Sequence, residues 1–191
     1  TQIFKVQEIP GVRSVYGRIV KDVNVDIEGV DEPRIGRMIS LPNPRRNVAN
    51  DIALTAGRYF SPGAQDEVIV NGRFAEHNGL KIGDRFQIAV ENRKYSLRIV
   101  GLALSPEYVY IIRNVQELLP SPERFGILWV PREFAETAMN MTAECNDIVG
   151  HVDNPEALSV ILDRAGKLLE PYGVFAKVQQ KDRVSTAFLN D

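Results

Sequence analysis

The stretch from residue 57 to residue 110 constrains the fold of this chain most strongly. Residues 68–70 form a short continuous run of Val and Ile, which is typical of a strand buried on both faces. Asn71 is a good N-cap for one or two helical turns over 73–78, and Gly79 stands where a left-handed residue ends a helix. The stretch therefore predicts a buried strand followed at once by a short helix.

A β-hairpin is predicted directly after this helix. Gly83 and Asp84 form a turn pair, and apolar residues then alternate with mostly polar ones on both sides of residues 91–94. The alternating apolar residues are Phe86, Ile88 and Val90 before the turn and Tyr95, Leu97 and Ile99 after it. We expect a small β-rich unit with one short helix, and no residue set in it is arranged for catalysis.

Apolar periodicity and proline positions predict the remaining elements. Residues 1–8 are expected to be a helix that ends before Pro10, because residues before proline avoid the helical region. The clearest helix pattern follows Asn154, the expected N-cap, and Pro155, the expected first helical residue. Its apolar stripe comprises Leu158, Ile161, Leu162, Ala165, Leu168 and Leu169. Further strands are expected at 12–27, 34–41, 125–130, 147–152 and 174–178, and further helices at 133–141 and 181–191.

The order of these elements predicts an α+β architecture with two subdomains. Strand, helix, strand, helix and strand over 125–178 indicate βαβ-type crossovers, and the first strands are expected to join the same sheet. After the proline-rich segment 42–47 the chain leaves that sheet, builds the β-rich unit and returns. We therefore expect a discontinuous α+β subdomain from 1–46 and 119–191, with an inserted β-rich subdomain at 47–118.

Several sequence strings in this order resemble a known family. They are GRYF at 57–60, DEVIVN at 66–71, GLKIGDRF at 79–86 and VGLALSPEYVY at 100–110, followed by FGILWVPR at 125–132, CNDIV at 145–149, LEPYG at 169–173 and FLND at 188–191. Together they resemble the extracytoplasmic domain of FtsX-like ABC-transporter permeases, also called the MacB-like periplasmic core domain. The resemblance covers nearly the whole chain, although no single string is specific.

The resemblance implies a fold, a location and a set of partners. The fold is a porter-like βαβ-type subdomain with an inserted β-rich one, held on the outer face of the cytoplasmic membrane between two membrane helices. The implied partners are an ABC ATPase subunit or domain, a second permease copy, and a periplasmic or extracellular partner protein or lipoprotein. The domain itself is implied to be non-catalytic, and we interpret residues 1–8 and 181–191 as levers that carry motion from the membrane.

The residues that carry chemistry are sparse, and we assign no catalytic, cofactor-binding or metal site. Cys145, Asp147 and His151 fall at alternating positions in the sequence, which could place metal ligands on one strand face, but an ordinary strand edge of mixed burial is the favoured interpretation. The phosphate-binding patterns GxxxxGK[ST] and GxGxxG are absent, so no nucleotide cofactor is expected. An enzyme is therefore disfavoured.

Two tyrosines are candidates for contact with a partner protein. Tyr108 and Tyr110 follow Pro106 and could form an exposed aromatic surface, while the simpler interpretation is a strand with tyrosines on one face. Trp129 lies in an apolar run, which favours a core position.

Composition narrows the class of protein. The net charge is −2 and no run of Lys or Arg exceeds two residues, which excludes a typical nucleic-acid surface. A single cysteine excludes an intramolecular disulfide bond, and no apolar run approaches the roughly 20 residues of a membrane helix. A soluble cytosolic binding or assembly module, with no role in transport, is the alternative function that these features leave open.

Overall fold

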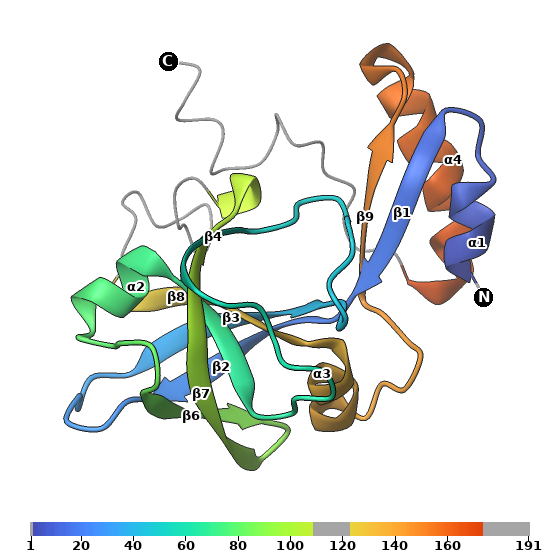
Figure 1. Cartoon of the computed structure of the whole chain (residues 1–191). Coiled ribbons are helices and arrows are strands. Elements are labelled where there is room, and N and C mark those ends of the chain that lie inside the picture. Colours follow the sequence, from blue (N-terminus) through green and yellow to red (C-terminus); the bar gives the residue numbers. More distant parts are fainter. Residues whose placement is uncertain (1, 109–122, 174–191) are drawn as a thin grey trace.

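The computed structural model describes residues 2–108 and 123–173 (Figure 1). Its larger part, here called the barrel, is a seven-stranded sheet that closes on itself because β6 pairs with both β2 and β7. The strands are β2 (Val20–Asp26), β3 (Arg34–Leu41), β4 (Ala53–Gly57), β5 (Glu67–Asn71), β6 (Arg85–Val90), β7 (Arg93–Leu104) and β8 (Phe125–Pro131). No helix within the described residues is long and apolar enough to cross a membrane.

The closure depends on the length of β7. This strand has twelve residues, so it pairs with β6 along its first half and with β4 along its last residues. Its other edge pairs in parallel with β5, which is antiparallel to β8. The parallel pair β8 and β3 and the antiparallel pair β3 and β2 complete the ring. Closing the sheet leaves fewer unpaired backbone edges than an open sheet of the same strands would have.

Strands β5 and β8 are buried on both faces, as the continuous apolar run of β5 predicted. Val68 and Val70 pack into one hydrophobic cluster, whereas Ile69 packs into another. The same alternation holds in β8, where Leu128 belongs to the first cluster and Trp129 to the second. Trp129 is therefore a core residue, as expected, and the two clusters together hold the barrel.

Two helices cover the barrel: α2 (Gly72–His77) and α3 (Arg132–Met139). Phe74 of α2 packs directly over Gly126, where an added Cβ would lie 2.6 Å from the ring. The cap of α2 differs from the sequence expectation, because the Asn71 side chain makes no cap hydrogen bond and instead accepts one from the Ile127 backbone N–H at 2.7 Å. The left-handed Gly79 (φ +65°) is confirmed.

The smaller part, here called the small lobe, stands beside the barrel (Figure 1). It consists of α1 (Gln2–Gln7), β1 (Val12–Arg18), β9 (Asp147–Val152) and α4 (Leu158–Leu169), with β1 antiparallel to β9. Helices α1 and α4 pack on this pair through an apolar cluster that includes Val6, Ile9 and Ile161. The N-cap predicted at Asn154 is confirmed, since its side chain accepts a hydrogen bond from the Glu156 backbone N–H at 2.9 Å. The first turn after this cap is the 3-10 helix η2 (Pro155–Ala157), and α4 follows it.

The mixed α+β class is confirmed, but the strands are divided differently from the expectation. β2, β3 and β8, expected in the porter-like subdomain, hydrogen-bond within the barrel, so the barrel is inserted between β1 and β9. In the structure the chain passes between the two parts near residue 19 and again before residue 147. The subdomain bounds expected at 46/47 and 118/119 stay a prediction, since 118/119 lies outside the described residues. The expected crossover from β8 through α3 to β9 is not formed, because β8 and β9 belong to different sheets. An apolar run shows that a strand is buried, but its partner strand is chosen by tertiary packing. The elements expected at 174–178 and 181–191 lie outside the described residues.

Candidate functional site

The two parts of the molecule meet at Ile19, the single residue between β1 and β2. Its side chain is fully buried, and its backbone N–H donates to the Ser40 hydroxyl at 2.8 Å. The Ser40 backbone N–H donates in turn to the Ile19 carbonyl at 2.9 Å. Ser40 belongs to β3, so the chain is fixed to the barrel at the point where it leaves the small lobe.

A buried ion pair lies next to this crossing point. Arg18, the last residue of β1, is 3% exposed and donates two hydrogen bonds to the Glu107 carboxylate, at 2.7 and 3.0 Å. Glu107 is also 3% exposed and lies in the 3-10 helix η1 (Pro106–Tyr108), which follows β7 of the barrel. The guanidinium also donates to Asp147, the first residue of β9, at 2.7 Å. Arg18 thus links both strands of the small lobe to the barrel.

The charges in this pair are complementary. Burial alone would lower the pKa of Arg18, but the hydrogen bonds and charges of Glu107 and Asp147 raise it above the usual range. The guanidinium therefore stays charged at every pH at which the fold persists. Removing one charge of a buried pair leaves the other uncompensated, which is strongly unfavourable. The pair therefore ties the two parts together with a defined geometry.

Asn146 makes a second connection at the same level. Its side-chain oxygen accepts from the Val20 backbone N–H and its amide donates to the Val20 carbonyl, both at 2.8 Å. Its own backbone N–H donates to the Arg18 carbonyl at 3.1 Å. Arg132 of α3 adds hydrogen bonds to the carbonyls of Gly17 and Glu144. Both chain crossings between the two parts are therefore fixed by side chains.

A small apolar cluster forms the third connection. Tyr16 of β1 and Val149 of β9 pack against Val48 and Ala49, which lie in the loop between β3 and β4. One face of the β1–β9 pair is therefore covered by α1 and α4, and the other contacts the barrel. These three connections make up the junction, which is our candidate functional site.

A cleft of about 650 Å³ opens beside the junction. One wall comes from α1 and β1, and the other from the loop after β3 and from α3. It is lined by Ile3, Phe4, Gln7, Val15, Tyr16, Gly17, Pro42, Asn43, Pro44, Arg45, Arg46, Arg132, Glu133 and Glu136. Clefts between structural units are common sites for small ligands.

The residues singled out from the sequence lie apart from one another. Tyr108 is half-buried in η1, where it packs against the cluster that contains Trp129, instead of lying in a strand. Tyr110 lies outside the described residues. The role of both tyrosines in partner contact stays a prediction.

The three residues weighed as metal ligands have different partners. Asp147 binds Arg18, and His151 Nδ1 lies 3.3 Å from the Ser14 hydroxyl. Burial raises the pKa of the Cys145 thiol, which lowers the fraction of reactive thiolate at neutral pH. Within the described part of the chain, no group of three or more His, Cys, Asp or Glu residues could hold a metal ion.

Sequence reasoning did not identify the junction residues. Arg18 lies in a segment that also holds the charged residues Arg13, Lys21 and Asp22, so the pattern does not single it out. Its partner Glu107 is 89 residues away in the sequence, and nothing local to either residue indicates the other.

Comparison with known proteins supports the fold. The sequence matches no protein-family model and no curated protein. The structure is similar to the extracellular domain of the noncanonic ABC-type transporter YknZ from Gram-positive bacteria, with a TM-score of 0.56 and 14% identity over 91% of this chain and 83% of that one. It is also similar to the periplasmic region of MacB from Actinobacillus actinomycetemcomitans, with a TM-score of 0.49 and 8% identity over 87% and 72%. The likeness to the YknZ domain shows a shared mixed α+β fold.

Proposed function

We propose that this chain is the non-catalytic extracytoplasmic domain of an ABC-transporter permease. Its task is to transmit ATP-driven motion of the membrane part to a substrate or partner outside the membrane. The observation that carries this proposal is the fold, which is similar over 91% of the chain to the extracellular domain of an ABC-type transporter. Function does not follow from fold alone, and the junction is the feature of this chain that favours transmission.

The junction favours transmission because it joins two parts that would otherwise be connected by two single chain crossings. A displacement of α1 acts on β1 and α4, against which this helix packs. It is then carried to the barrel by Arg18 and Asn146, whose side chains bind partners across the junction. Packed elements with buried polar contacts move as rigid bodies, whereas a flexible linker absorbs motion.

The partners in this proposal are those of a permease domain. An ABC ATPase subunit or domain binds nucleotide on the cytosolic side, and a second permease copy completes the transporter. A partner protein or lipoprotein meets the domain on the outer face of the cytoplasmic membrane. Tyr108 follows Glu107 directly, so contact with a partner at this tyrosine would act next to the buried ion pair.

The first test is the reading frame that encodes this chain. We expect about 20 consecutive apolar residues on each side of it, enough for one membrane helix each. A reading frame with no such segments would contradict the proposal and favour a soluble cytosolic binding or assembly module.

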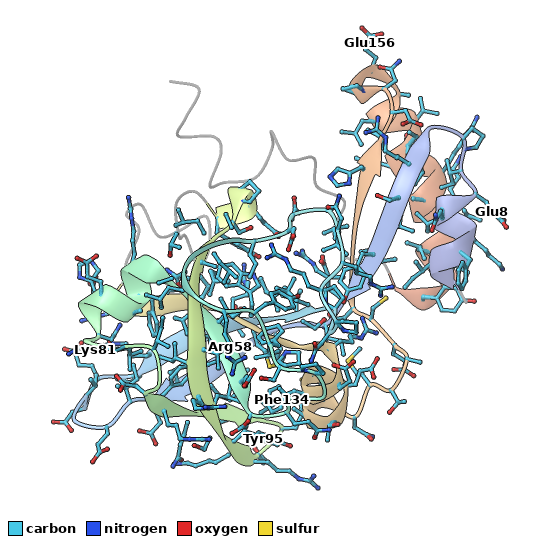
Figure 2. The ribbon with its side chains drawn as sticks, in the orientation of Figure 1. Glu8, Arg58, Lys81, Tyr95, Phe134 and Glu156 are labelled. Atoms are coloured by element: carbon cyan, nitrogen blue, oxygen red, sulfur yellow. The ribbon has the colours of Figure 1, made fainter. Side chains whose placement is uncertain are left out.

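The second test measures transmission directly in the full-length transporter. Spin labels at Glu8→Cys on the small lobe and Lys81→Cys on the barrel, in a Cys145→Ser background, report the distance between the two parts. Figure 2 shows both residues on the outside of the molecule, on opposite sides. We expect this distance to stay constant between the nucleotide-free and ATP-bound states, while the distance between Lys81→Cys labels in the two copies changes.

A variant with a weakened junction completes this test. Asn146→Ala removes both side-chain hydrogen bonds to Val20. It should broaden the distance distribution between the two labels and reduce the nucleotide-dependent movement of the barrel, with ATP hydrolysis retained. Asn24→Ala, at an exposed position of β2, is the matched control. It should leave the distance distribution and the movement of the barrel unchanged. A nucleotide-dependent change in the Glu8–Lys81 distance of the unmodified junction would contradict rigid transmission.

A further inference from the structure

We propose that the cleft between the small lobe and the barrel binds a small zwitterion with an apolar group, that is, a free apolar amino acid or a short apolar peptide. Its volume of about 650 Å³ lies within the range of about 300–1,000 Å³ that is typical of small-ligand sites. The proposal concerns the cleft of this chain itself and does not depend on the role in transport proposed above.

The apolar part of the ligand is indicated by the walls of the cleft. Ile3, Phe4 and Val15 line it from the small lobe, and Pro42 and Pro44 from the barrel. Phe4 is 66% exposed, whereas Val6 of the same helix is buried in the apolar cluster of the small lobe. An apolar side chain placed between these walls would remove Phe4 from water, which is favourable in proportion to the area covered.

The charged groups of the ligand are indicated by the charged residues of the cleft that lack an ionic partner. We first identify the charged lining residues that already have partners. Arg132 donates to Glu136 at 2.8 Å, so these two lining residues satisfy each other. Arg45 donates to Asp51 at 3.1 Å and to the Ile52 carbonyl at 2.8 Å. These contacts leave two charged lining residues to be accounted for.

Arg46 and Glu133 are those two residues. Within the described residues, Arg46 has no carboxylate partner and stacks over the Tyr16 ring at 5.5 Å, and Glu133 has no cationic partner. Arg46, Glu133 and Tyr16 all line the same cleft. One free cation and one free anion match the carboxylate and the ammonium of a zwitterion, whereas a simple anion or a simple cation would meet one unlike and one like charge.

Tyr16 adds an independent observation. It lines the cleft and is 8% exposed, and its buried hydroxyl lies near the Arg132 guanidinium but lacks a well-aligned hydrogen bond among the described residues. Buried polar atoms in folded proteins are nearly always hydrogen-bonded, so an unpaired one needs an explanation. A polar ligand group that reaches this hydroxyl would give it a well-aligned partner.

The test uses the chain itself and two probes, L-leucine and the dipeptide Leu-Leu, followed by amide chemical shifts in NMR titrations. We expect shifts confined to residues around the cleft, such as Phe4, Gly17 and Arg46. The probe that binds more strongly identifies the source, a free amino acid or a peptide. Octanoate, which lacks the ammonium group, and glycine, which lacks the apolar group, should bind at least tenfold more weakly.

Variants assign the binding to the named residues. Arg46→Gln and Glu133→Gln should each weaken binding of the better probe about tenfold, because each removes one charge-assisted contact. Phe4→Ser should remove the preference for leucine over glycine. Arg73→Gln and Glu76→Gln, exposed changes of the same types on α2, are the matched controls and should leave binding unchanged. Absence of shifts at the cleft with both probes, equal binding of octanoate, or binding unaffected by both cleft variants would overturn the proposal.

Discussion

Replacing Arg18 by methionine should destabilise the fold more than any change of an exposed charge. The substitution keeps much of the side-chain length but removes three hydrogen bonds, two to Glu107 and one to Asp147. Glu107, which is 3% exposed, then loses the two hydrogen bonds from the Arg18 guanidinium, and breaking a buried pair of this kind costs about 3–5 kcal/mol. Asp147 contributes less to this cost because its side chain is 35% exposed and can be hydrated. For a chain of this size, we expect the melting temperature to fall by about 6–20 °C.

The assay is urea unfolding of four proteins: the unmodified chain, Arg18→Met, Glu107→Leu and the double variant. Removing both charges leaves no unmatched charge between these two buried positions, and only the part-exposed Asp147 still loses its bond to Arg18. The double variant should therefore be more stable than the sum of the two single losses predicts, by about 2 kcal/mol or more. Arg13→Met is the control, because the Arg13–Asp153 pair is 65% and 58% exposed and should contribute less than about 1 kcal/mol. Equal losses for Arg18→Met and Arg13→Met, or strictly additive losses in the cycle, would refute the reasoning.

Three further predictions concern other parts of the molecule. Burial would raise the pKa of Glu67, but hydrogen bonds from arginine and serine lower it from 4.5 to about 2. The ionised Glu67 should therefore stabilise the fold fully above pH 4.5, and this stabilisation should be lost as the pH falls towards 2. We expect the loss in the free energy of unfolding to be about 2 kcal/mol, because the arginine partners are partly exposed and their charges are screened by water. Urea unfolding should show a weaker dependence of stability on pH for Glu67→Gln than for the unmodified chain. Gly126→Ala should lower the free energy of unfolding by about 1–3 kcal/mol because its Cβ meets the Phe74 ring, whereas Gly72→Ala, with open space around it, should change the free energy by less than about 0.5 kcal/mol. Cys145 should react with iodoacetamide more slowly than free cysteine at pH 7, because burial raises the pKa of its thiol; an equal rate would contradict this.

The local structure was determined largely by the sequence. The strand at β5 and the hairpin of β6 and β7 follow from apolar patterns of a few residues, and the structure contains both. The N-cap Asn154 and the left-handed Gly79 are likewise encoded by single residues. These features depend on backbone sterics and on hydrogen bonds to near neighbours, so a short window of sequence contains all the groups involved.

The tertiary structure alone decided which strands pair and where the two parts meet. β3 pairs with β8, and the sheet closes between β6 and β7, although every apolar strand offers the same backbone groups to any neighbour. The cleft takes its walls from four separate segments, and Arg18 meets Glu107 across 89 positions of sequence. Such contacts arise only when hydrophobic burial has brought distant segments together, because a charged residue specifies the kind of partner that it needs but not the position of that partner in the chain.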